Sequence, residues 1–339
     1  MLAVVGLTTI GSAAPMRPAS AQSAADFYRG RTITFVVSTA TGGGYDAYAR
    51  LLGRHMGAHI APDAKMIVQN MPGAGGIRAM SYLHSVAPKD GATLGMVHSG
   101  VPMAPALGIE EAKFDPNAMT WIGSMNKEGM VCISWHASPI KTFEDTFTKE
   151  FIVGGSGGGS QMETYPLMMA RMFHAKIRII SGYKSGTAVY LAMERGEVMG
   201  RCGNSMTSIR ATKPEWIEKK LINFVVQTSL EPDPDLAGVP MLLDYAKTER
   251  DKKVLEIIFA SQLMDRPVLA PPSVPADRAA LLRKALKETL ADPALLADAK
   301  KQKLEIRYVS GEDVAALLKR VTSASPDVLK AAAEALKQN

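Results

Sequence analysis

One stretch near the N-terminus, residues 33–50 with the sequence ITFVVSTATGGGYDAYAR, constrains the fold more than any other. It joins an apolar run typical of a buried strand, three consecutive glycines and an amphipathic segment typical of a helix. Asp46 occupies the first turn of that helix, and Arg50 follows four residues later as a helical partner. A strand, a glycine loop and a helix in this order point free N–H groups at one spot, so we expect an anion-binding loop.

The same unit recurs along the chain. Strand-like runs end in polar glycine loops at residues 38–46, 70–76, 98–100, 154–160, 182–186 and 203–205. This order predicts an α/β fold with parallel, helix-covered sheets, and the loops at the carboxyl ends of their strands should line a cleft. We predict two domains, residues 22–117 together with 260–339 and residues 118–259, with the ligand cleft between them. The helices of the Ala, Lys and Leu-rich tail are expected to pack on the first domain.

The composition limits the classes of function. The 339 residues are 47% hydrophobic and 21% charged, as in ordinary globular proteins, and the net charge is +6. The basic residues are scattered rather than clustered with aromatic residues, which argues against a nucleic-acid partner. The longest uncharged run after the N-terminal region, residues 91–109, is interrupted by Pro102 and Pro105 and is therefore not expected to span a membrane.

Residues 1–21 have the features of an export signal. An apolar segment, Leu2–Ile10, precedes the cleavage pattern Ala19-Ser20-Ala21, so we expect an exported protein cleaved near Ala21. No Lys or Arg precedes the apolar segment, which departs from the usual pattern. Cys132 and Cys202 leave two alternatives open in an exported protein, a disulfide or two buried thiols.

Two catalytic motifs match only formally. Gly42-x-Gly44-x-x-Ala47 resembles a dinucleotide fingerprint, but the acidic residue at the right spacing, Asp63, precedes the second strand instead of ending it. Gly154-x-Ser156-x-Gly158 resembles a nucleophile elbow, but only His174 follows it and no acid-then-His order is present. Binding groups thus outnumber catalytic ones, and we expect no enzyme activity; an exported serine hydrolase using Ser156 stays as an alternative.

No cofactor or metal is expected. Neither glycine loop is followed by a phosphate-binding lysine, and two cysteines are too few for a typical Cys-metal site. His55 and His59 lie four residues apart, but no Glu follows His55 as a zinc-protease motif requires.

Longer motifs resemble a known family. ITFVVSTATGGGYDAYARLL, NMPGAGGIRAMSYL and APKDGATLGM are similar to the extracytoplasmic receptors of tripartite tricarboxylate transporters, also called Bug or TctC-like proteins. SGYKSGTAVYLAMERGEV and PDPDLAGVPMLLDYA resemble later parts of the same family, so the resemblance covers about residues 31–320. Tyr45 stands where a small residue is usual, and Gly203-Asn204 replaces an Asp; these departures leave the identity of the ligand open.

The resemblance implies a type II periplasmic binding protein fold with two lobes, each a mainly parallel sheet flanked by helices. It also implies a monomeric periplasmic receptor that closes on a small di- or tricarboxylate or aromatic carboxylate and delivers it to membrane permease subunits; a ligand-presenting sensory receptor is the other alternative. The candidate ligand-binding residues are Thr39, Thr41, Gly42, Gly43, Gly44, Tyr45, Asp46, Pro72, Gly73, Ala74, Gly75, Gly76, His98 and Ser99 in the first lobe, and Ser156, Gly158, Ser160, Tyr183, Ser185, Gly186, Thr187 and Asn204 in the second.

Overall fold

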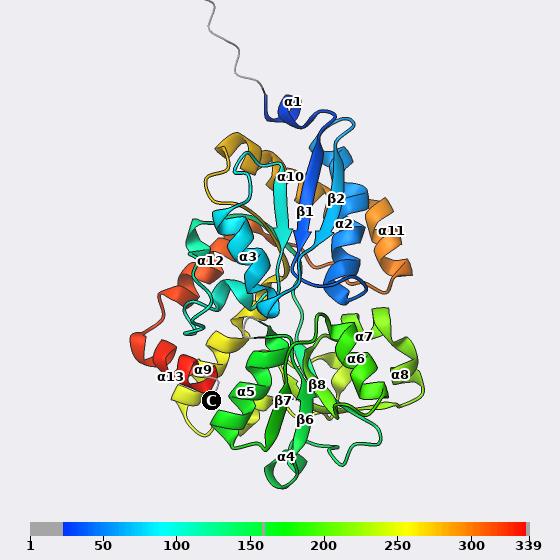
Figure 1. The fold of residues 1–339 in the computed structure, drawn as a ribbon, viewed down its shortest axis with the longest axis vertical. Coiled ribbons are helices and arrows are strands. Elements are labelled where there is room, and N and C mark those ends of the chain that lie inside the picture. Colours follow the sequence, from blue (N-terminus) through cyan, green and yellow to red (C-terminus); the bar gives the residue numbers. More distant parts are fainter. Residues whose placement is uncertain (1–22, 158–159, 337–339) are drawn as a thin grey trace, which may run out of the picture.

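The computed structural model describes residues 23–157 and 160–336 of the chain. Figure 1 shows two lobes stacked along the long axis, each built on a sheet with helices packed around it. The two-lobed α/β fold expected from the sequence is confirmed. The export signal expected at residues 1–21 lies outside the described residues. Within the described ranges, no helix is both long enough and apolar enough to cross a membrane.

The first lobe contains a six-stranded sheet with the strand order β11-β4-β10-β3-β1-β2. β1 pairs in parallel with β2 and β3, whereas β10 is antiparallel to β3 and β4, and β11 is antiparallel to β4. The sheet is therefore mixed rather than mainly parallel, because β10 returns from the second lobe and enters the sheet from the opposite end. The strands are β1 (Thr32–Val37), β2 (Lys65–Asn70), β3 (Thr93–Met96), β4 (Thr120–Asn126), β10 (Asp265–Ala270) and β11 (Val309–Ser310).

The second lobe contains a five-stranded mixed sheet with the order β7-β6-β8-β5-β9. β6 is parallel to β7 and β8, and β5 is antiparallel to β8 and β9. Cys132 in β5 and Cys202 in β8 form a disulfide, which decides between the two alternatives that the sequence left open. The strands are β5 (Met130–Trp135), β6 (Phe151–Gly154), β7 (Ile177–Ile180), β8 (Gly200–Asn204) and β9 (Ile222–Thr228).

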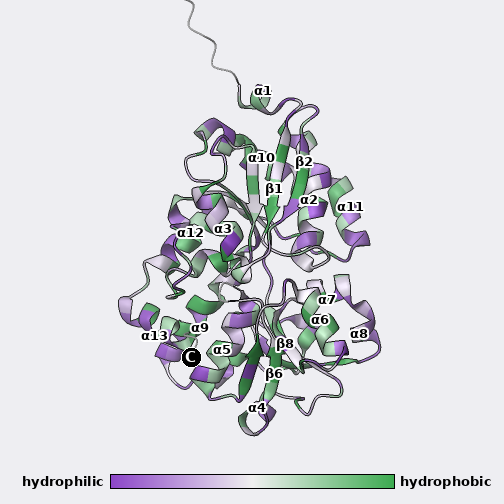
Figure 2. Cartoon of the chain, in the orientation of Figure 1, coloured by the Kyte–Doolittle hydropathy of each residue, from purple (hydrophilic) through white to green (hydrophobic). Residues whose placement is uncertain are grey.

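Helices cover both sheets, and Figure 2 shows hydrophobic residues along the strands and hydrophilic residues on outward helix turns. The helices of the first lobe are α1 (Ala24–Tyr28), α2 (Gly44–Ile60), α3 (Ile77–Ser85), α10 (Ala276–Ala291), α11 (Pro293–Lys301) and α12 (Gly311–Thr322). Those of the second lobe are α4 (Asp145–Thr148), α5 (Gln161–Phe173), α6 (Gly186–Glu194), α7 (Met206–Thr212), α8 (Pro214–Glu218) and α9 (Glu249–Phe259).

The C-terminal helix α13 (Pro326–Leu336) packs against α5 and α9 of the second lobe. The expectation that the tail packs on the first lobe is wrong for this helix, although α12 does pack against β4. Ala332, Ala335 and Leu336 are buried there. The apolar stripe of this helix predicts that one face is buried, but it does not predict which lobe buries it.

The domain boundaries expected at residues 118 and 260 stay a prediction. We propose that the chain crosses to the second lobe after Asn126, because β4 pairs with β10 and β11 inside the first sheet. The return crossing then lies between α9 and β10, close to the boundary expected from the sequence.

Helix α2 follows the first glycine loop, as the sequence predicts, and Asp46 lies in its first turn. Tyr48, Leu51, Leu52 and Met56 recur at helical spacing and are fully buried against β1, β2 and α10. Burial of this apolar stripe fixes α2 on the sheet and directs its N-terminus toward the second lobe (Figure 1).

Asp46 ties the glycine loop to the start of α2. Its Oδ2 accepts hydrogen bonds from the backbone N–H of Gly42 and from Nε of Arg50, both at 2.9 Å, and its Oδ1 accepts one from Asn70 at 2.8 Å. The predicted pairing with Arg50 is confirmed. Burial raises the pKa of Asp46, but the hydrogen bonds from Arg50, Gly42 and Asn70 outweigh it, so the pKa lies below its ordinary value.

We expect Asp46→Asn to lower the free energy of unfolding by about 1–3 kcal/mol, because charge-assisted hydrogen bonds are lost in a buried position. Urea unfolding at pH 7 measures the change. Because the carboxylate is stabilised in the folded state, the difference from wild type should shrink as the pH falls through the pKa of folded Asp46. Asp26→Asn, in an exposed pair with Arg29, is the control and should leave stability unchanged; equal effects at both positions would contradict this account.

Candidate functional site

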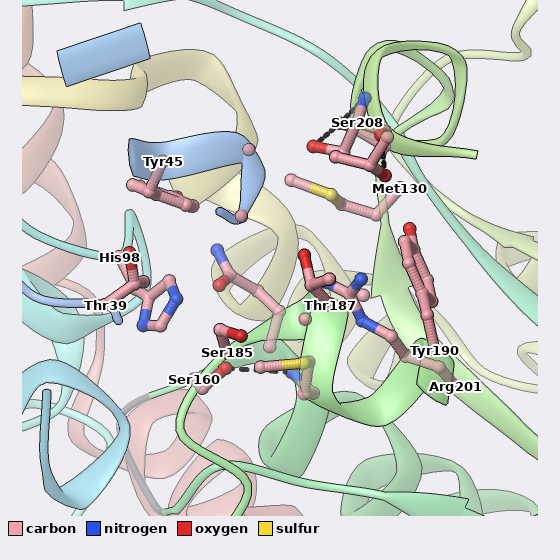
Figure 3. A pocket seen from close by; sticks show the side chains of 18 of the residues that line it. Thr39, Tyr45, His98, Met130, Ser160, Ser185, Thr187, Tyr190, Arg201 and Ser208 are labelled. Carbon is pink, nitrogen blue, oxygen red and sulfur yellow. Dashed lines mark hydrogen bonds between the residues drawn. The ribbon is translucent and has the colours of Figure 1, made fainter. Parts of the chain in front are cut away.

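A cavity lies between the lobes, where the glycine loops of both lobes meet. The space open to the centres of water-sized spheres is about 40 Å³, room for about three waters. Figure 3 shows Thr39, Tyr45 and His98 on one side of this space and Ser208, Tyr190 and Arg201 on the other. The lining residues are Thr39, Gly43, Gly44, Tyr45, His98 and Arg266 of the first lobe, and Met130, Ser160, Gln161, Met162, Ser185, Gly186, Thr187, Tyr190, Arg201, Gly203, Ser205, Ser208 and Thr212 of the second.

Three helices of nine or more residues begin at the wall of the cavity, namely α2, α5 and α6. Ser160 caps α5 by accepting a hydrogen bond from Met162 N–H, and Ser185 caps α6 by accepting one from Ala188 N–H. The remaining N–H groups and the positive ends of the helix dipoles face the same space. The glycine loops and helix N-termini are thus gathered as the sequence predicts, and anion binding by them stays a prediction.

Arg201 in β8 adds a full positive charge to this wall. Its side chain is only 9% exposed, and its guanidinium carbon lies 4.9 Å from the centre of the Tyr190 ring. Its Nε has no hydrogen-bond partner, and among the described residues no carboxylate forms an ion pair with it. Burial lowers the pKa of Arg201, and the charge of Arg266 acts in the same direction. An anion in the cavity would relieve both costs.

Gly186, the first residue of α6, makes room for this guanidinium. A Cβ at this position would lie 2.4 Å from Nη1 of Arg201. Because Gly186 has no side chain, Arg201 can lie against the N-terminus of α6. The guanidinium and the positive end of the α6 dipole are therefore adjacent. None of the cavity-lining residues in the described chain is Asp or Glu, so the lining itself holds no charge that would neutralise them.

Arg266 in β10 is the second arginine of the cavity wall and, unlike Arg201, has an internal partner. Its guanidinium forms an ion pair with the carboxylate of Asp265, and both side chains are almost fully buried. Neighbouring residues of a regular strand point to opposite faces, but Arg266 has a φ of 61°, which breaks the alternation. Burial lowers the pKa of Arg266, but electrostatic interactions with Asp265, Tyr45, Tyr48 and Glu128 together outweigh it and raise the pKa above its ordinary value.

The Arg266 side chain also connects the lobes. Its Nη2 donates hydrogen bonds to Oγ of Ser208 at 2.8 Å and to Oγ of Ser205 at 3.3 Å, both in the second lobe. Within the first lobe its guanidinium carbon lies 4.3 Å from the ring centre of Tyr45 and 4.9 Å from that of Tyr48. The hydroxyl of Tyr45 donates a hydrogen bond to Asp265 at 2.9 Å. Tyr45, the departure from the family pattern, is thus fixed in the cavity wall and takes up space there.

Nine of the candidate binding residues line the cavity, and the rest lie elsewhere. Those that line it are Thr39, Gly43, Gly44, Tyr45, His98, Ser160, Ser185, Gly186 and Thr187. Those placed outside its lining are Thr41, Gly42, Asp46, Pro72, Gly73, Ala74, Gly75, Gly76, Ser99, Ser156, Tyr183 and Asn204. Gly158 lies outside the described residues.

The loop from Pro72 to Gly76 faces the other lobe instead of the cavity. Gly75 N–H donates a 2.9 Å hydrogen bond to the carbonyl of Ser156, and a Cβ on Gly157 would lie 2.9 Å from Gly75 N. Asn204 is also used internally, because its Oδ1 accepts a hydrogen bond from Tyr190 at 2.8 Å. The order of the strands predicts where the glycine loops lie, but it does not predict which polar groups of these loops face the cavity.

Sequence reasoning did not place Arg201, Arg266, Tyr190, Gln161, Ser205 or Ser208 in the site. Tyr190 and Ser208 come about one turn after glycine loops, Ser205 ends the loop at residues 203–205, and no motif distinguishes them. Arg266 follows Asp265 in the sequence, an adjacent pair of opposite charges in an otherwise apolar run. That pair is the one feature of the sequence that could have indicated a buried Arg266, because charged residues are rarely buried unless they are paired.

The fold and the cavity define a two-lobed binding protein, and three solved structures share this fold. BugD, a periplasmic binding protein, has a TM-score of 0.71 and 20% identity over 90% of this chain and 97% of its own. MatC from Rhodopseudomonas palustris with bound malate has a TM-score of 0.68 and 19% identity over 88% and 98%. Rpa4515 from R. palustris with adipate has a TM-score of 0.69 and 18% identity over 89% and 97%. At these identities the likeness concerns the fold.

Residues 49–209 match the model of the tripartite tricarboxylate transporter family receptor, TctC. The matched stretch is just under half of the chain, and the family is the one that its motifs resemble. Receptors of this family are substrate-binding proteins, not enzymes. The buried Oγ of Ser156 has no hydrogen-bond partner among the described residues, whereas the hydrolase alternative requires a histidine beside it. A search of curated protein sequences finds no match, and the described residues contain no group of three His, Cys, Asp or Glu that could hold a metal.

We expect Asp265→Asn to lower the free energy of unfolding by about 3–5 kcal/mol, because it leaves the buried charge of Arg266 without a partner. Glu150→Gln is the matched control, since it breaks an exposed pair with Arg178 and should change stability little. Urea unfolding followed by circular dichroism measures both variants. A loss below about 1 kcal/mol for Asp265→Asn would show that the pair is not needed for the fold.

Proposed function

We propose that the protein captures a small carboxylate in the cavity between its lobes and delivers it to the permease subunits of a tripartite tricarboxylate-type transporter. The observation that carries this proposal is Arg201, a buried guanidinium at the cavity wall with an unpaired Nε and no carboxylate partner among the described residues. A buried charge of this kind is costly unless a partner of opposite charge arrives. MatC with malate and the R. palustris protein with adipate support a carboxylate as that partner.

The energetics are sufficient for capture at micromolar concentrations. Hydrogen bonds to a charged group contribute about 1.5–3 kcal/mol each, and micromolar affinity needs about 8 kcal/mol. Three helix N-termini and Arg201 offer more donors than a single carboxylate can use. The small size of the cavity favours a ligand of few atoms, partly because the Tyr45 ring occupies the space left by a small residue in related sequences.

We further propose that binding and release use a hinge motion between the lobes. Direct contacts hold the lobes together around the cavity: Ala40 N–H donates to the carbonyl of Lys184 at 3.2 Å, and the hydroxyl of Thr187 donates to the carbonyl of Gly42 at 2.7 Å. A ligand enclosed by both walls gains contacts that an open form lacks, so it shifts the population toward closure. Closure would present the joined surface of both lobes to the permease.

Export belongs to the same proposal. The apolar segment and the cleavage pattern at Ala21 support secretion through residues 1–21, and a periplasmic location suits both a disulfide and a receptor for a membrane permease. The monomeric state stays a prediction.

Titration calorimetry against C3–C6 carboxylates tests capture. We expect at least one of them to bind, and Arg201→Met to weaken it about 10- to 150-fold, because a charge-assisted hydrogen bond of 1.5–3 kcal/mol is removed while the side-chain volume is kept. Arg178→Met, at an exposed arginine in strand β7 of the same sheet, is the control and should bind as wild type does. If no carboxylate binds while a sugar or a cation does, the proposed ligand class is wrong.

Gly44→Ala tests the closed arrangement. Its Cβ would lie 2.5 Å from Oγ of Ser208 across the interlobe gap, so the variant should fold but bind its carboxylate at least tenfold more weakly, because the lobes cannot close fully. Gly43→Ala is the control, since its Cβ would meet Ser185 at an ordinary 3.7 Å. The double variant Gly44→Ala with Ser208→Gly should regain part of the affinity. Calorimetry and small-angle scattering measure these changes, and unchanged affinity in Gly44→Ala would argue against closure in this geometry.

A further inference from the structure

His98 follows β3 and forms part of the first-lobe wall of the cavity, where its residue is 6% exposed. Its Nδ1 lies 2.8 Å from the carbonyl oxygen of Gly75. A carbonyl oxygen can only accept a hydrogen bond, so Nδ1 must carry the hydrogen. This contact fixes the tautomer of the ring whenever the ring is neutral.

The ring is neutral at physiological pH. Burial lowers the pKa of His98 to about 4, opposed by the hydrogen bond to Gly75 and assisted by the positive charges of Arg201 and Arg266. With the hydrogen on Nδ1, Nε2 keeps its lone pair and can only accept. Among the described residues no donor forms a hydrogen bond with Nε2.

The position of this acceptor is set before any ligand arrives. The Tyr45 ring packs edge-on against the His98 ring, with the centres 4.7 Å apart and the planes at 81°. Tyr45 itself is held by hydrogen bonds, because its hydroxyl accepts from Ser99 N–H at 3.0 Å and donates to Asp265 at 2.9 Å. Figure 3 shows the His98 ring on the side of the cavity opposite Arg201.

The cavity thus presents two unlike requirements. Arg201 and the helix N-termini favour an anion, whereas Nε2 of His98 favours a group that donates a hydrogen bond. An ammonium group would meet the second requirement but would lie near two guanidinium groups in a lining that has no Asp or Glu among the described residues. A neutral hydroxyl meets it without that repulsion.

We propose that the site selects hydroxycarboxylates, with the ligand's carboxylate at Arg201 and its hydroxyl donating a hydrogen bond to Nε2 of His98. This inference rests on the proposed function, because it specifies the carboxylate that the receptor takes. His98 then determines specificity and Arg201 provides the charge. A ligand without the hydroxyl leaves Nε2 buried and unpaired, which is the strongest ground on which a polar site rejects an analogue.

Calorimetry on the mature protein at pH 7 tests the inference with two series, malate, succinate and aspartate, and lactate, propionate and alanine. Within a series the ligands differ only in carrying a hydroxyl, a hydrogen or an ammonium group. We expect the hydroxy acid of at least one series to bind about tenfold or more tighter than its deoxy partner, and the amino acid to bind more weakly than either. The preference should be constant from pH 6 to pH 8, because the ring stays neutral there.

Two variants separate the acceptor from the rest of the ring. His98→Asn can still donate to Gly75 but places no acceptor near the position of Nε2, so the preference for the hydroxyl should disappear while the deoxy acid binds within about threefold of wild type. His98→Gln can place its amide oxygen near that position and should retain part of the preference. Thermal unfolding checks that both are folded, and His136→Phe, an exposed histidine remote from the cavity, is the control.

The outcomes separate this inference from the proposed function. Equal affinities for hydroxy and deoxy acids in wild type would overturn the role of His98 and leave carboxylate capture standing. Tighter binding of the amino acids would also overturn it, since a cationic group would then be preferred. Absence of binding by every carboxylate would overturn the proposed function, and this inference with it. The comparison in wild type is decisive even if a variant does not fold.

Discussion

The buried pair of Asp265 and Arg266 is the interaction on which the arrangement of the lobes depends. A guanidinium and a carboxylate removed from water are tolerated because each neutralises the other and further hydrogen bonds engage both groups, although Nε of Arg266 has no hydrogen-bond partner among the described residues. Arg266 reaches Ser205 and Ser208 in the second lobe, and Asp265 accepts the hydroxyl of Tyr45. One pair in one strand therefore links the lobes and fixes a side chain of the cavity wall. Its left-handed backbone is the local strain that this geometry requires.

The two arginines of the cavity have different tasks because their surroundings differ. Arg266 is neutralised inside the protein, so it serves structure, whereas Arg201 has no carboxylate partner among the described residues and keeps its charge for a ligand. Helix N-termini add partial positive charges around the same space without requiring any counter-charge. A small cavity enclosed by protein strengthens all of these interactions. In the proposed function, this site attracts an anion while its shape and one acceptor, His98, restrict which anion fits.

Features that depend on near neighbours in the chain could be predicted. The strand, loop and helix around Gly44 follow from apolar spacing and three glycines, and the pairing of Asp46 with Arg50 follows from one helical turn. The gathering of glycine loops at the gap follows from the order of strands. The role of the Pro72–Gly76 loop could not be predicted in the same way, because a backbone N–H bonds equally well to a ligand or to Ser156 of the other lobe.

Residue order alone is enough to establish the α/β class, the recurring glycine loops and the resemblance to the receptor family, and to predict an anion site, since all of these arise from local patterns of apolar, glycine and charged residues. Folding in three dimensions settles what those patterns leave open: that β4 and β10 run through a mixed sheet, that α13 covers the second lobe, that Cys132 bonds Cys202, and that Arg201, Arg266 and His98 meet at one cavity. These outcomes depend on contacts between residues far apart in the chain. The free energy of such a contact depends on both segments, so it cannot be predicted from either segment alone.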